Sequence, residues 1–163
     1  MRGLPGLLVT LALVWLAAVL QQSMAQRLAV FGCEPNFLLA VMAPMALVSR
    51  PAVGGWIGFA AGLTQGALAG ANLTHYVISR TVAGFLTSLG SLLDIRLAIG
   101  VAGLVCAACT LVAQVLFMFL APPPGGSIVS YLLTSFGTSV YDALLAMPIY
   151  ALIRRWFGPQ TVA

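Results

Sequence analysis

The sequence contains very few charged residues. Of 163 residues only 6% are charged, lysine is absent, and aspartate and glutamate together number 3. An average soluble domain has about 25% charged residues. So few charges cannot cover the surface of a soluble fold, whereas 61% of the residues are apolar. The composition therefore indicates an integral membrane protein that lies almost wholly in the bilayer.

The scarcity of polar chemistry also excludes several functions. The arginines form no basic cluster, so the chain has no electrostatic footprint for nucleic acid. His75 is the only histidine and the carboxylates are far apart, which leaves no catalytic set and no metal-ligand cluster. Cys106 and Cys109 lie in an apolar run without further ligands, so we interpret them as small apolar filler. We expect neither an enzyme nor a cofactor.

Proline, glycine and the charges divide the chain into six apolar segments. About 20 residues cross a bilayer as a helix. The sequence therefore predicts a single all-α integral membrane domain over 1–163, a bundle of six transmembrane helices. Segment 37–48 is the weakest, and is either strongly tilted or partly re-entrant. The six segments are 4–20, 37–48, 52–71, 73–93, 97–120 and 128–153.

The arginines predict an orientation. With both termini in the cytoplasm, five arginines lie at the inner side and only Arg27 lies outside, as the positive-inside rule expects. The first segment also resembles a signal peptide that ends at Ser23-Met24-Ala25, although an uncleaved helix suffices for insertion and is favoured. The inner arginines are Arg2, Arg50, Arg96, Arg154 and Arg155.

A ladder of glycines runs along segment 52–71. Its members recur every four residues and form a slowly turning groove without side chains. Such grooves let two helices approach closely in lipid. We favour packing within the bundle, and the alternative is a contact face for another membrane protein. The ladder consists of Gly54, Gly58, Gly62, Gly66 and Gly70.

Five polar residues lie within or at the ends of the apolar segments. Asp142 and Arg80 are the two charged ones, and their predicted depths differ by about 10 Å, which disfavours a direct ion pair. The alternatives are an arginine that reaches outward and an aspartate bonded to neighbouring hydroxyls. Asn36, Gln65 and His75 either line a cavity with them or make structural hydrogen bonds, and we favour the latter. Pro148 is expected to kink the last helix.

Three stretches carry a family resemblance. They are Pro35-Asn36-Phe37-Leu38-Leu39, the run from Pro51 to Gly70, and Tyr141 to Tyr150 followed by Arg154-Arg155. Together they resemble the rod shape-determining protein MreD family, over roughly residues 30–156. The family has an acid after the first proline and another in the glycine-rich helix. Asn36 and Gln65 stand at those places here, which puts any role that needs a carboxylate in doubt.

The resemblance implies a function. MreD-like proteins are non-enzymatic scaffold subunits of the bacterial rod complex, or elongasome, in the inner membrane. They bind the bitopic protein MreC, in a complex with MreB, RodA and a class B penicillin-binding protein that builds the lateral cell wall. We expect contacts along the glycine ladder and through the outer loop 21–35. The family fold is similar to the S components of energy-coupling factor transporters, so the alternative is a vitamin- or metal-binding S component. A small transporter or channel is a third possibility.

Overall fold

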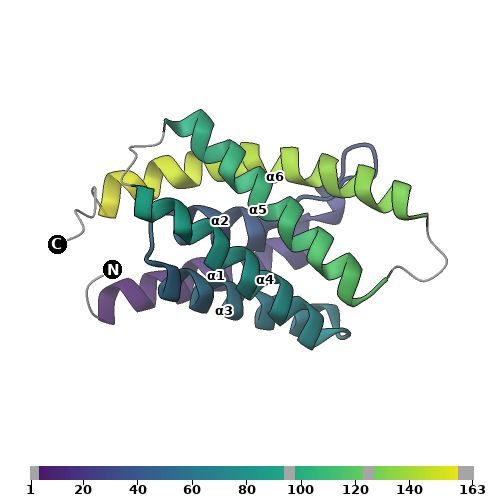
Figure 1. The fold of residues 1–163 in the computed structure, drawn as a ribbon, viewed down its shortest axis with the longest axis horizontal. Helices are drawn as coiled ribbons and strands as arrows, with labels where there is room; N and C mark the ends of the chain where they lie inside the picture. Colours follow the sequence, from purple (N-terminus) through teal and green to yellow (C-terminus); the bar gives the residue numbers. More distant parts are fainter. Residues whose placement is uncertain (1–3, 94–97, 123–126, 158–163) are drawn as a thin grey trace.

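The computed structural model describes residues 4–93, 98–122 and 127–157. This part of the chain is all-helical, with six α-helices and no strand (Figure 1). The prediction of six helices is confirmed. The helices are α1 (Leu4–Met24), α2 (Phe37–Leu47), α3 (Pro51–Ala69), α4 (Leu73–Leu89), α5 (Ile99–Leu120) and α6 (Ile128–Phe157), with the short 3-10 helices η1 (Gln26–Leu28) and η2 (Gly90–Leu93).

Three helix ends differ from the expected ones by four residues. α4 ends at Leu89, where η2 begins, and α1 continues past the polar residues that begin at Gln21 to Met24, with the Ser23 hydroxyl donating to the Val19 carbonyl at 2.8 Å. α6 continues past residue 153 to Phe157, with two arginines in its last turn, where cations are favourable. The expected boundary at 94–97, with Asp94 and Arg96, lies outside the described residues, as does Arg2.

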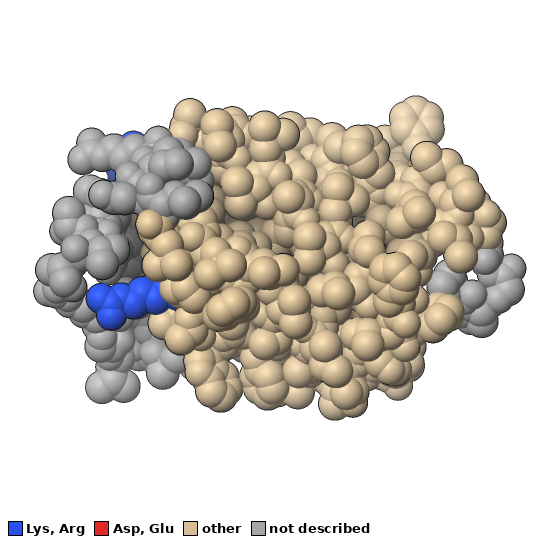
Figure 2. All heavy atoms as spheres, in the orientation of Figure 1, with Lys and Arg blue, Asp and Glu red and all other residues tan. Residues whose placement is uncertain are grey.

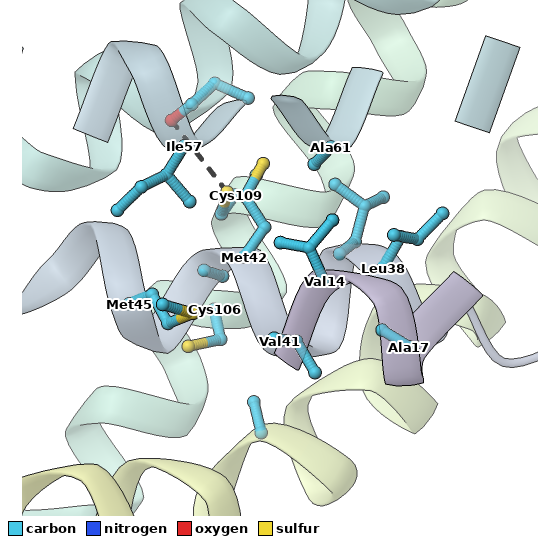
Figure 3. Close-up of a cluster of buried hydrophobic side chains, with 14 of the residues drawn as sticks. Val14, Ala17, Leu38, Val41, Met42, Met45, Ile57, Ala61, Cys106 and Cys109 are labelled. Carbon is cyan, nitrogen blue, oxygen red and sulfur yellow. Dashed lines mark hydrogen bonds between the residues drawn. The ribbon is translucent and has the colours of Figure 1, made fainter. Parts of the chain in front are cut away.

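The short helix α2 forms the core of the bundle. Ten of its eleven residues are buried, and it packs against every other α-helix. Figure 3 shows Leu38 and Met42 of α2 among side chains from α1, α3 and α5. A helix that is apolar on all sides is expected in such a position. At about 1.5 Å per residue α2 is roughly 16 Å long, about half the apolar thickness of a bilayer.

The surface of the bundle is rich in exposed apolar side chains. Trp15 on α1 and Trp56 on α3 are each 70% exposed, and the other longer helices also expose large apolar residues. α5 and the Ile128–Arg155 part of α6 are long and apolar enough to cross a membrane by length and composition, a test that a core helix of a soluble protein also passes. In the described part of the molecule, the face in Figure 2 shows arginine at one end and no other charged side chain.

The two ends of the bundle differ in their described arginines. α1 begins at the same end of the bundle at which α6 ends (Figure 1). Arg154 and Arg155 lie at this end. Arg50, which lies between α2 and α3, is also at this end. Arg27 in η1 follows α1 and lies at the other end. The asymmetry that the sequence indicated is therefore present among the described arginines.

Candidate functional site

The first polar cluster joins α6 to the start of α2. Asp142 is 0% exposed. Its Oδ1 accepts the backbone N–H of Asn36 at 2.7 Å, and its Oδ2 accepts the Thr110 hydroxyl at 3.2 Å. The side chain of Asn36 accepts the N–H of Leu39 at 3.1 Å, as an N-cap does. A carboxyl group from α6 thus lies at the N-terminus of α2, where its oxygen accepts an N–H that has no partner within the helix.

α1 completes this cap through Gln21. Its Oε1 accepts the N–H of Phe37 at 2.8 Å, and its Nε2 donates to the carbonyl of Pro35 at 3.4 Å. The first N–H groups of a helix have no partner within the helix. Here Asp142 of α6, Gln21 of α1 and the cap residue Asn36 itself accept three of these N–H groups. The start of α2 is therefore fixed to both α1 and α6, which sequence reasoning missed because Gln21 looked like the end of a segment.

The second polar cluster surrounds Arg80 on α4. Arg80 is 1% exposed, so the alternative of an arginine that reaches outward is wrong. Its Nε donates to Gln65 Oε1 of α3 at 3.0 Å. Its Nη1 donates to the Ser79 hydroxyl and to the Ala113 carbonyl of α5, both at 3.1 Å. The guanidinium group thus joins α3, α4 and α5.

Two aromatic rings cover the same guanidinium. Arg80 Cζ lies 5.1 Å from the ring centre of Tyr76 and 5.7 Å from that of Phe117. The two rings pack on each other with centres 4.4 Å apart. A cation over an aromatic face is attracted by the ring quadrupole, more strongly when it is desolvated. These contacts replace water around a charge that the fold buries.

The two clusters do not form an ion pair. No nitrogen of Arg80 lies within 4.0 Å of a carboxylate oxygen in the described part of the chain. Asp142 reaches α5 at Thr110 and Arg80 reaches it at Ala113, so their contacts on α5 are only three residues apart. The depth difference is smaller than the sequence indicated, yet each charged group is held by its own neutral partners.

The remaining predicted polar residues are distributed unevenly. Asn36 belongs to the Asp142 cluster and Gln65 to the Arg80 cluster. His75 is half-buried and its Nδ1 has no hydrogen-bond partner among the described residues. The five residues therefore form two clusters and one separate side chain. Pro148 lies inside α6, where it removes one backbone hydrogen bond.

Most of the glycine ladder lies against α4 of the same chain. A Cβ at Gly62 would lie 2.6 Å from the carbonyl oxygen of Tyr76, and one at Gly66 would lie 2.8 Å from the Cα of Leu73. Real Cβ atoms essentially never approach so closely. The groove is thus filled from within the bundle, and no second protein can enter it without displacing α4. The glycines that meet α4 are Gly54, Gly58, Gly62 and Gly66.

α4 contributes a glycine of its own to this contact. A Cβ at Gly84 would lie 2.5 Å from the carbonyl oxygen of Gly54. The last member of the ladder, Gly70, has a different role. It ends α3 in the left-handed conformation with φ 65°, and a Cβ there would meet nothing within 4 Å. Gly70 is therefore a helix cap and lies outside the close contact.

The cysteine pair lies in the apolar core. Cys106 and Cys109 are buried and unpaired, beside Met42 and Met45 of α2 (Figure 3). The Cys109 thiol points to the carbonyl of Ala83 at 3.8 Å. Among the described residues, no group of three histidine, cysteine, aspartate or glutamate side chains is placed to hold a metal. Both thiols therefore pack as small core residues.

Comparison with family models, with curated proteins and with solved structures finds no match to this chain.

Proposed function

We propose that the chain is a six-span, non-enzymatic scaffold subunit of the rod complex in the bacterial inner membrane, which binds an MreC-like bitopic protein. The sequence resemblance supports the family. The observation that carries the scaffold role is that the buried polar side chains bond to the chain's own helices. Arg80 joins three helices, and Asp142 and Gln21 fix the start of a fourth. Such a bundle is suited to hold a fixed shape for partners.

Three features support the six-span membrane topology. The helices number six, their outer faces carry large apolar side chains, and the described arginines mark one end of the bundle. Under the positive-inside rule this end, with both termini, faces the cytoplasm. α2 is about half as long as a helix that spans the bilayer. It therefore crosses only the inner half, and segment 29–36 carries the chain through the outer half.

The alternative, an S component, needs ligand groups that are free to bind. Asn36 is occupied as the cap of α2, and Arg80 uses two of its three nitrogens on protein oxygens. Among the buried side-chain polar atoms of the described structure, His75 Nδ1 and the Thr81 hydroxyl lack a partner, and the His75 nitrogen is the observation that favours the alternative. A single imidazole nitrogen does not orient a vitamin. We therefore propose the scaffold role first.

Mild-detergent copurification tests this proposal. The tagged chain is purified from its native membranes and the recovered proteins are identified by mass spectrometry, with an untagged strain as the control. We expect an MreC-like bitopic protein together with enzymes of wall synthesis. Recovery of paired ABC-type ATPases with a coupling subunit would instead overturn the scaffold role in favour of the S component.

A further inference from the structure

Arg80 is a buried cation without a counter-charge beside it. It is 1% exposed, and its hydrogen-bond partners Gln65, Ser79 and Ala113 are neutral. It makes no ion pair with a carboxylate in the described part of the chain. Asp142 is the buried carboxyl group of the bundle, and both of its oxygens bond to other residues. A buried charge is costly unless it is paired, so this site lacks one negative charge.

The guanidinium group leaves one of its nitrogens free. Nη1 donates to Ser79 and Ala113, and Nε donates to Gln65 Oε1. Nη2 has no hydrogen bond to a described residue. Nε and Nη2 lie on the same edge of the planar fork, and such an edge binds carboxylate and phosphate groups through two oxygens. Half of this edge of Arg80 is therefore unused.

Gln65 adds a second free donor beside the edge. Its Oε1 accepts from Arg80, so the oxygen of the amide faces the guanidinium. The amide nitrogen Nε2 is bonded to the same carbon as Oε1 and has no hydrogen bond within the described structure. Two N–H donors thus lie close together without an acceptor, and one of them carries charge. We call these two nitrogens, Arg80 Nη2 and Gln65 Nε2, the open edge.

The open edge reaches the surface near the outer end of the bundle. Among the described residues the fully enclosed side-chain atoms that lack a partner are His75 Nδ1 and the Thr81 hydroxyl, so neither nitrogen of the open edge is enclosed. Gln65 lies four residues before the end of α3, and Arg80 lies seven residues after the start of α4. At about 1.5 Å per residue, both lie within roughly 10 Å of the end where α3 turns into α4 (Figure 1).

Water and the neighbouring rings do not supply the missing charge. Tyr76 and Phe117 attract the cation through their ring quadrupoles, but they carry no net charge. A water molecule accepts hydrogen bonds from such donors and leaves the charge unpaired. An oxyanion does both, because it accepts the two N–H groups and neutralises the guanidinium.

We propose that the open edge binds an oxyanion group, a carboxylate or a phosphate, which serves as the counter-ion of Arg80. One oxygen accepts from Arg80 Nη2 and another accepts from Gln65 Nε2. The group belongs to a small anion from the outer medium or to the headgroup of an anionic lipid, since both offer the same oxygens at this end of the bundle. Two donors hold one anionic group and do not enclose a larger ligand, so the site goes beyond the scaffold function without changing it.

Thermal unfolding of the purified full chain in a neutral detergent tests the site. In one arm sodium acetate or sodium phosphate replaces sodium chloride stepwise at constant ionic strength. In the other arm the chloride buffer is kept and phosphatidylglycerol is added, with zwitterionic phosphatidylcholine as the control. We expect at least one arm to show a saturating rise in melting temperature, of about 3–6 °C at roughly ten times the dissociation constant. A rise in the salt arm identifies a free anion, a rise with phosphatidylglycerol alone identifies a lipid headgroup, and no rise in either arm overturns the proposal.

Substitutions of Gln65 separate the site from the general stabilisation that phosphate gives to folded proteins. Gln65→Glu places a carboxylate of the chain itself beside Arg80, so we expect a melting temperature that no longer responds to the oxyanion. Gln65→Leu is the matched control, because it removes the amide without adding a charge, and it should keep part of the response. An equal response in Gln65→Glu and in the unmodified chain overturns the proposal, as does complete loss of the response in both variants. Partner copurification is measured separately, so either result leaves the scaffold function standing.

Discussion

Replacing Asp142 tests whether this carboxylate serves as a cap for α2. Leucine has the same branching as aspartate but accepts no hydrogen bond, so Asp142→Leu leaves the Asn36 N–H and the Thr110 hydroxyl without their acceptor. The hydroxyl can rotate to a carbonyl one turn earlier in its own helix. The buried N–H of Asn36 has no such choice, because segment 29–36 is not helical.

The expected loss of stability comes mainly from the Asn36 N–H, which is left without an acceptor. A buried N–H without a partner costs about 1–3 kcal/mol. This loss corresponds to a fall in melting temperature of about 2–12 °C for a chain of this size.

The assay is thermal unfolding of the purified chain in one mild detergent. Asp142→Asn keeps an acceptor oxygen for the Asn36 N–H and should lose less than half as much. Thr134→Leu is the matched control, because Thr134 is exposed on the same helix and bonds only to its own helix at Ser130. An unchanged melting temperature for Asp142→Leu would refute the cap, and equal losses for leucine and asparagine would show that the acceptor oxygen does not matter.

Four further substitutions test the rest of the bundle by the same assay. Gly62→Ala should lower the melting temperature, because its Cβ would lie 2.6 Å from the Tyr76 carbonyl oxygen. Gly55→Ala should leave the melting temperature unchanged or raise it, because the nearest atom to its Cβ would lie 3.9 Å away and alanine is about 1 kcal/mol more favourable than glycine in a helix. A larger fall in melting temperature at Gly55 than at Gly62 would contradict the close contact of α3 with α4. Gln65→Leu removes the acceptor of Arg80 Nε and should destabilise the chain, whereas Gln65→Glu supplies a counter-charge and should stabilise it. Stabilisation by leucine together with destabilisation by glutamate would contradict this account of Arg80.

The sequence predicted the helices well because long apolar runs and their breakers are local signals. It identified α2 as unusual from its length, and Pro51 at the first position of α3 marks that helix start. It could not place α2 at the centre. A short helix with apolar residues on every side has the same sequence pattern whether it crosses the membrane or lies in the core of a bundle.

The sequence could identify the polar residues of the two clusters, but it could not show which residues each of them contacts. The glycine spacing indicated a close approach, but α4 was identified only when Gly84 was found opposite Gly54. Gln21 looked like a stop signal because its contact with Phe37 lies across the fold. The left-handed φ of Phe31 has no sequence signal at all, since Phe-Gly is an uncommon choice for a two-residue turn.

The half-length of α2 accounts for both the cap at its start and the non-helical segment that precedes it. A full-length span would have filled the outer half of the bundle with helix and left no turn beside α6. Because α2 begins at Phe37, its first N–H groups need acceptors from other helices, and Asp142 and Gln21 supply them. The same start leaves segment 29–36 outside any helix, with a tight turn at 30–33, while Thr138 donates to the Glu34 carbonyl and Phe31 is exposed. The cap and the exposed turn are thus two consequences of one short helix.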